Sequence, residues 1–200
     1  MWYKVKRILV GTQQVRPERN YEYYCNFRNS SQSAMTSDWW SIKTWTPTFS
    51  ANGISGSSVR AFKWIPTLTS TSKIKLKCWF ILQSWAALAY SLTEAYSTWT
   101  YKSNLWGSYF DGINQTEYSI WNTIYYIHAV SGTGTWEMNI DLGNNTVTYS
   151  NSLYNSWAIQ TKTISAAEKT NVLLATNIRI LLVGNATDNA TIQDLSILIK

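Results

Sequence analysis

The 200-residue chain is poor in several residue types, and each shortage excludes a class of protein. One histidine and two cysteines are fewer than the four nitrogen and sulfur ligands of a structural zinc site. The longest apolar runs are far shorter than a membrane span. Residues 1–11 place only three consecutive apolar residues after their charges, too few for the core of a signal peptide. We therefore expect a globular chain that is cytosolic, exported by another route or packaged into a particle.

Charged residues are also scarce, at 14% of the chain, whereas aromatic residues reach 15% and include 12 tryptophans. Tryptophan combines a large apolar face with one N–H donor, which suits surfaces that grip sugars or protein partners. Much of the remaining chain is Ser, Thr and Asn, which hydrogen bond without charge. This composition favours a β-rich recognition protein over a metabolic enzyme.

The formal net charge is +6, and about half a dozen of the basic residues fall within the first 28 positions. Three more lysines alternate with apolar residues in the segment 73–78, KIKLKC. Such alternation predicts the solvated face of one strand, and no nucleic-acid-binding motif accompanies it. We expect no nucleic acid among the partners and no membrane insertion.

Several segments rich in β-branched and aromatic residues predict strands, and turn clusters lie between them. They are 21–27, 58–65, 73–82, 118–130, 135–141, 145–150, 177–183 and 191–199. Only 164–175 suggests a helix, with Ser165 as N-cap and Glu168 three residues on. Residues 84–95 fit either a helix or a strand, and 29–41 read as a polar loop. The fold class is therefore all-β, either a β-sandwich or a β-barrel.

The two cysteines, Cys25 and Cys78, both lie in apolar or aromatic stretches. This setting favours two buried free thiols, because free cysteine behaves as a small buried hydrophobe. A single bridge between an early and a middle strand is the alternative.

From about residue 40 to 200 the order of features resembles the concanavalin A-like (laminin-G-like) jelly-roll family. Residues 121–126 (WNTIYY) are similar to its Trp-opening strand, 136–145 (WEMNIDLGNN) to its hairpin, and 192–197 (IQDLSI) to its last strand. The opening 6–17 (KRILVGTQQVRP) resembles the N-terminal segment of bacteriophage virion proteins that carry such domains.

This resemblance implies an all-β fold, a single jelly-roll β-sandwich of two antiparallel sheets. An attachment arm, residues 1–17, would precede this lectin-like domain, residues 18–200. Arm residues Arg7, Val10, Gln14 and Arg16 would then attach the chain to the particle. The implied location is the virion, assembled in the host cytoplasm, as a tail-fibre, head-fibre or capsid-decoration subunit.

Glu137, Asn139 and Asp141 share one face of a predicted strand, because side chains repeat every two residues. This pattern is similar to the catalytic strand of jelly-roll glycanases, E-x-D-x-E. Here, however, the middle residue is an amide, Asn139, in place of a carboxylate. We expect an ordinary strand in which Asp141 stabilises the following turn, and no catalytic residues. The only histidine, His128, has no nucleophile elbow beside it, so we interpret it as structural or surface-exposed.

Two turn segments, 111–114 and 185–189, carry oxygen ligands of the kind that calcium prefers. Neither has enough carboxylates to bind the ion alone. We therefore expect no cofactor, with a structural calcium as the alternative.

The tryptophans divide into two predicted groups. Trp79, Trp121 and Trp136 lie within strands and are expected to pack between the sheets. Five others lie near polar or glycine-containing stretches and are expected to be exposed, where they would stack on sugars or line a subunit interface. These candidate ligand-binding residues are Trp39, Trp40, Trp45, Trp99 and Trp106.

With this resemblance, the sequence predicts a non-enzymatic virion structural protein, a fibre or decoration subunit. We expect it to form a homo-oligomer and to bind other virion proteins. Its lectin-like domain would contact glycans of the host surface through aromatic stacking and uncharged hydrogen bonds. The alternatives are a bacterial carbohydrate-binding module, a jelly-roll glycan hydrolase and a purely structural capsid protein.

Overall fold

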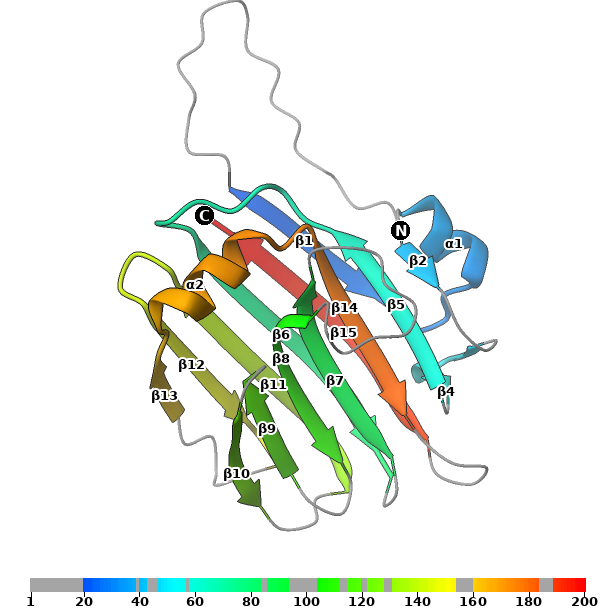
Figure 1. Cartoon of the computed structure of the whole chain (residues 1–200). Helices are drawn as coiled ribbons and strands as arrows, with labels where there is room; N and C mark the ends of the chain where they lie inside the picture. The colour runs from blue at the N-terminus through cyan, green and yellow to red at the C-terminus, as the bar shows by residue number, and fades with distance from the viewer. Residues whose placement is uncertain are drawn as a thin grey trace, which may run out of the picture.

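A computed structural model of the chain describes residues 20–38, 40–42, 47–56, 58–83, 86–93, 104–111, 115–119, 122–127, 131–153, 160–183 and 189–200. They form two antiparallel sheets packed face to face, with few helices (Figure 1). The predicted all-β sandwich is confirmed. Within the described part of the chain, no helix is long and apolar enough to cross a membrane.

The first sheet has eight strands, in the order β13-β12-β11-β6-β15-β4-β3, with β1 also pairing with β15. β15 pairs with two strands in succession along one of its edges. Its first residues pair with β4, and the residues from Asp194 onward pair with β1. A bulge at Gln193 separates the two stretches, and its carbonyl accepts the Phe27 amide at 2.9 Å. The strand bounds are β1 Tyr21–Asn26, β3 Thr48–Ser50, β4 Gly53–Gly56, β6 Lys73–Leu82, β11 Gly132–Asp141, β12 Thr146–Asn151, β13 Gln160–Thr163 and β15 Ala190–Ile199.

The second sheet has seven strands, in the order β10-β9-β8-β7-β14-β5-β2. The bounds are β2 Trp40–Ile42, β5 Ser58–Trp64, β7 Ala87–Thr93, β8 Asn104–Asp111, β9 Gln115–Ser119, β10 Asn122–Ile127 and β14 Asn177–Val183. The ambiguous segment 84–95 contains strand β7. The predicted single strand 118–130 is instead parts of two strands, β9 and β10, which pair as a hairpin.

The core lies between the sheets, and β6 shows how the sequence builds it. Its apolar residues at alternate positions are 0–3% exposed, because they all point to the inner face. The intervening lysines point outward, as the alternation predicts. The inward residues are Ile74, Leu76, Cys78, Phe80 and Leu82. The β11–β12 hairpin also forms where predicted, with Asp141 opposite Thr146.

Two short helices flank the sandwich. The predicted helix is α2, Ala166–Leu173, and it carries a full capping box in which Ser165 and Glu168 each accept from the other's backbone amide. It lies across one end of the sandwich (Figure 1). The expected loop 29–41 contains the other helix, α1 (Gln32–Ser37), capped by Ser31. Its single buried residue, Met35, gives too little periodicity to predict a helix.

Candidate functional site

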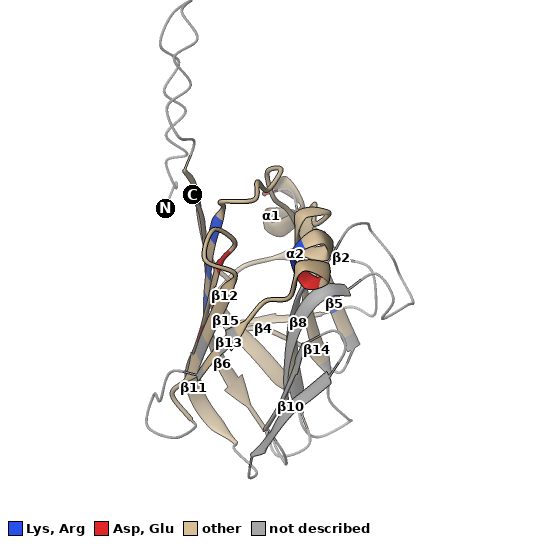
Figure 2. Cartoon of the chain, turned by 60° about the vertical axis from the view of Figure 1, so that its left-hand side comes forward, with Lys and Arg blue, Asp and Glu red and all other residues tan. Residues whose placement is uncertain are grey.

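The outward side chains of four neighbouring strands form one continuous surface on the eight-stranded sheet. The pairing of β11 with β6 and β12 brings residues distant in sequence into rows across the strands. Figure 2 shows the two layers from the side, with basic and acidic residues along this sheet. We call this surface the polar face; it comprises Lys73, Lys75, Lys77, Trp79, Thr135, Glu137, Asn139, Asp141, Thr146, Thr148, Ser150, Asp194 and Ser196.

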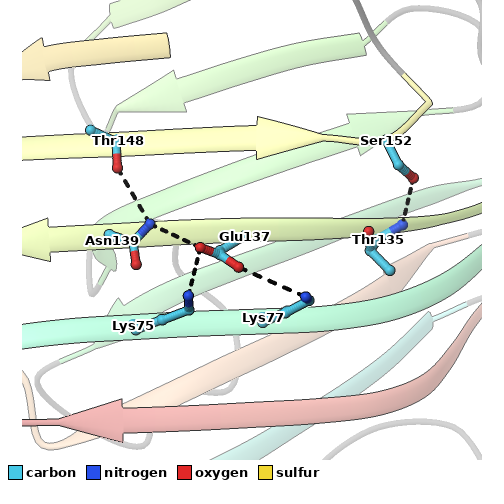
Figure 3. A network of polar contacts seen from close by, with 7 residues as sticks. All are labelled: Lys75, Lys77, Thr135, Glu137, Asn139, Thr148 and Ser152. Carbon is cyan, nitrogen blue, oxygen red and sulfur yellow. Dashed lines mark hydrogen bonds and ion pairs between the residues drawn. The ribbon is translucent and has the colours of Figure 1, made fainter. Parts of the chain in front are cut away.

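Glu137 is the centre of a polar network on this face (Figure 3). Its Oε1 lies 2.8 Å from Lys75 Nζ and its Oε2 lies 3.9 Å from Lys77 Nζ. Asn139 Nδ2 donates to the same carboxylate at 3.2 Å, and also reaches Thr148 Oγ1 at 3.4 Å. Burial alone would raise the pKa of Glu137. Hydrogen bonds from Lys75 and Asn139 and the two ammonium charges outweigh burial and hold that pKa below its ordinary value.

Asp141 ties the end of β11 to the hairpin turn. Its carboxylate accepts the Asn144 backbone amide at 3.0 Å and the Asn144 side-chain amide at 2.9 Å. Lys73 Nζ lies 3.0 Å away. The hydrogen bond from the Asn144 backbone, followed by that from Lys73, lowers the pKa of Asp141. The predicted role of Asp141 in the turn is confirmed.

Neither carboxyl has the environment of a general acid. A general acid of a glycanase needs a raised pKa, so that it holds a proton to donate near neutral pH. The pKa values of Glu137 and Asp141 are both lowered, and cationic partners already occupy each carboxylate. These two groups can accept hydrogen bonds from a ligand, but they are poor proton donors.

The lowered pKa values predict a loss of stability in acid. A carboxyl whose pKa is lower in the folded than in the unfolded state stabilises the fold above its ordinary pKa, here 4.5 for Glu137 and 3.8 for Asp141. That stabilisation disappears as the pH falls through the folded-state pKa. We expect the melting temperature to fall as the pH drops below about 5, and the double variant Glu137→Gln, Asp141→Asn to show a smaller fall. Calorimetry across this range measures both; equal falls would contradict the assignment.

Trp79 lies on the polar face, so its expected position between the sheets is wrong. Its neighbours in sequence, Cys78 and Phe80, point into the core, and strand alternation therefore turns the indole outward. The ring is half-buried, and Lys77 Nζ lies 5.0 Å from its centroid. Trp136, by contrast, is fully buried as expected.

Next to Trp79 in register lies Asp194, an outward-facing residue that is only 3% exposed. Its two oxygens are occupied from β1 and the segment that follows it. Tyr24 Oη donates to Oδ1 at 2.7 Å, and Arg28 Nη1 lies 2.9 Å from Oδ2. The Tyr24 ring itself is 42% exposed. The polar face is therefore bordered by two accessible aromatic rings, Trp79 and Tyr24.

The expected exposure of Trp40 is wrong, because this residue is 2% exposed and belongs to the core. Its ring packs edge-on against Phe27 at a centroid distance of 5.5 Å, and its Nε1 donates to Tyr23 Oη at 2.6 Å. Tyr23 in turn donates to Asp38. Polar neighbours in the sequence suggested exposure, but the packing partners come from β1 and the turn after it.

Lys63 is buried beside this cluster, with its Nζ 4.1 Å from the centre of the Tyr23 ring and 3.5 Å from Asp38 Oδ1. Burial lowers the pKa of Lys63, although the Asp38 charge opposes that shift. Burial also raises the pKa of the Cys25 thiol to about 11. Cys25 is half-buried, Cys78 is fully buried, and no disulfide joins them, so the bridged alternative is wrong.

Several predicted residues lie outside the described part of the chain. These are Trp39, Trp45, Trp99, Trp121, His128 and the arm residues Arg7, Val10, Gln14 and Arg16. Trp106 lies in β8, where its backbone pairs with Leu92. Most of both predicted calcium turns also falls outside. Within the described ranges, no three His, Cys, Asp or Glu side chains group as they would around a metal ion.

The exposed Trp64 was missed by the sequence reasoning, as was Tyr24. Trp64 ends β5 and is 58% exposed. It lies on the outer side of the seven-stranded sheet, where Phe62, Arg179 and Leu181 are 2–6% exposed. Because Lys63 points inward, the alternation of side chains in a strand predicts that Trp64 points outward. The outer side of that sheet is therefore buried at Phe62, Arg179 and Leu181, whereas Lys73 and Lys75 of the polar face are exposed.

No family model matches the chain, and no curated protein matches it significantly. Among solved structures, a basic lectin of winged bean in complex with Tn antigen is similar, with a TM-score of 0.67 and 10% identity over 91% of this chain and 99% of the lectin. An endo-1,3-β-glucanase of Streptomyces sioyaensis has a TM-score of 0.53 and 12% identity over 94% and 99% of the two chains. The CBM2 module of the evolved Dit protein of Lactobacillus casei BL23 phage J-1 has a TM-score of 0.54 and 9% identity over 92% and 91%. The chain thus has the β-sandwich fold of these lectin-like proteins.

Proposed function

We propose that the chain is a non-enzymatic carbohydrate-recognition protein whose polar face binds a glycan beside Trp79. The observation that carries this proposal is an accessible indole set among paired carboxylates, lysines, an amide and hydroxyls on one open sheet. A sugar presents an apolar face for an aromatic ring and hydroxyls that both donate and accept hydrogen bonds. The polar face offers both kinds of contact. The lectin-like fold supports the same function.

The partners of Glu137 and Asp141 favour binding over hydrolysis. Both carboxyls are held ionised by lysines, and the middle position of the strand is the amide of Asn139. The similarity to a glucanase is a similarity of fold at 12% identity. We therefore propose a lectin rather than a glycan hydrolase.

The glycan-binding proposal predicts different effects for two outward-facing tryptophans. Trp79→Ala removes the ring from the polar face and is expected to weaken binding to the glycan at least about tenfold. Trp64→Ala removes an exposed ring from the other sheet and is expected to leave binding unchanged. A glycan array, followed by titration calorimetry with the strongest glycan bound, measures both. Failure of every glycan to bind, or loss of binding in Trp64→Ala alone, would refute the proposal.

We further propose that the chain acts as a subunit of a bacteriophage particle. Two observations support this setting: the opening 6–17 resembles virion attachment segments, and a phage Dit module shares the fold. Copies on a particle would convert weak single-site glycan binding into strong attachment through avidity. A bacterial carbohydrate-binding module would instead act as a monomer.

The virion proposal predicts assembly in solution. Light scattering on the purified protein, with and without residues 1–17, is expected to show a trimer or higher oligomer, or assembly that requires the arm. A monomer in both forms would contradict a fibre or decoration subunit, and would favour the carbohydrate-binding module.

A further inference from the structure

The charges at the centre of the polar face balance one another closely. Lys75 and Lys77 both face the single carboxylate of Glu137, and Lys73 pairs with Asp141. The chain as a whole carries a net charge of +6. On this stretch of the face, by contrast, three lysines are paired with two carboxylates. This stretch of the face therefore presents little net charge to a ligand.

We infer that Glu137 sets the charge class of the glycan: by occupying Lys75 and Lys77, it makes the polar face a site for uncharged glycans and disfavours acidic ones. This inference rests on the proposed function and names the ligand class for the same site. Glu137 is then a specificity-determining residue of the polar face.

An acidic sugar meets two obstacles at this position. Its carboxylate or sulfate must compete with Glu137 for Lys75, which is already 2.8 Å from Oε1. It must also approach the Glu137 carboxylate itself, and two like charges at short range repel. Asn139 also stabilises the ionised carboxylate, because its amide donates at 3.2 Å to Oε1, the same oxygen that Lys75 approaches.

An uncharged hydroxyl meets neither obstacle. An ionised carboxylate can accept about four hydrogen bonds, and the partners described above occupy at most three of these places on Glu137. The Glu137 side chain is 20% exposed and those of Lys75 and Lys77 are 46% and 32% exposed, so a ligand can reach all three. A sugar hydroxyl can donate to the carboxylate and accept from an ammonium group without separating the pairs.

The test is a glycan array that presents galactose- and glucose-terminated oligosaccharides, each beside its sialylated, uronic-acid or sulfated form. Wild type is expected to bind the neutral member of a pair at least about fivefold more tightly than the acidic member. Glu137→Gln keeps the shape and the acceptor oxygen but frees two lysines. It is expected to shift that ratio about five- to tenfold toward the acidic member.

Glu22→Gln is the matched control, because it removes one negative charge at an exposed residue of β1, opposite Leu198 of β15 and outside the network of Glu137, Lys75 and Lys77. It is expected to keep the wild-type ratio, and thermal unfolding shows whether each variant is folded. Preference of wild type for acidic glycans, an unchanged ratio in Glu137→Gln, or an equal shift in Glu22→Gln would overturn the inference while leaving glycan binding intact. Binding of no glycan at all would overturn the proposed function and the inference with it.

Discussion

Gly53→Ala is expected to destabilise the fold by about 2–5 kcal/mol, because both the backbone and the space at this position require glycine. The residue has a φ of +124°, a conformation that L residues rarely adopt. A Cβ placed there would lie 2.1 Å from the Ile192 carbonyl oxygen and 2.9 Å from the Ile192 carbonyl carbon. Both atoms are backbone, and Ile192 is the last residue of β15 paired with β4, next to the Gln193 bulge. The clash therefore acts on the pairing of two strands.

Gly143→Ala is the control for this experiment. Gly143 lies in the exposed β11–β12 turn. An added Cβ would lie 3.2 Å from Asp141 Oδ1, and the next nearest atom, Thr71 Cα, would be 3.9 Å away. The Asp141 side chain can shift, so the cost is expected to stay below about 1 kcal/mol. Urea unfolding of the two variants compares them directly. Similar stability of the two variants would contradict the close approach of Gly53 to β15.

Trp136→Ala is expected to destabilise the protein by about 3–5 kcal/mol. Trp136 has no exposed surface, lies in the core cluster and stands opposite Cys78 on β6 and Asn151 on β12. Removing the indole leaves a cavity that the strands on both sides cannot close without losing their register. The loss combines the transfer of a large apolar group to water with the cost of that cavity.

Trp79→Ala provides the contrast, since both residues belong to paired strands of one sheet and only the side they face differs. The Trp79 ring is only partly buried, so its loss is expected to cost less than about 1.5 kcal/mol. Chemical denaturation with the linear extrapolation method measures both values. Equal costs would mean that Trp79 also serves the core, which would remove it from the candidate site.

The sequence predicted those parts of the fold that depend on local pattern. Alternation in 73–82 identified β6 and its inner face, Asp141 with the glycine and two asparagines after it identified a hairpin, and Ser165 with Glu168 identified α2. In each case the determining residues lie within about ten positions of one another, so no knowledge of strand pairing was needed.

Features that depend on pairing between distant segments could not be predicted. Glu137 meets Lys75 and Lys77 only because of the register between β11 and β6, and a shift of one residue would turn these side chains to the core. Trp40 is buried by Phe27 and Tyr23, which sequence neighbours do not reveal. The alternation in β6 already predicts that Trp79 points outward, because Cys78 and Phe80 on either side of it point inward. A position inside a strand does not by itself imply burial.

The most direct test of the account is an NMR titration of the ¹⁵N-labelled protein with the glycan that the array identifies. The indole N–H signals are assigned by single Trp→Phe variants. The account predicts that the Trp79 indole and the backbone amides of β6 and β11 around Glu137 shift with glycan concentration, while the Trp64 indole does not. Shifts confined to Trp64 and the seven-stranded sheet would contradict binding at the polar face.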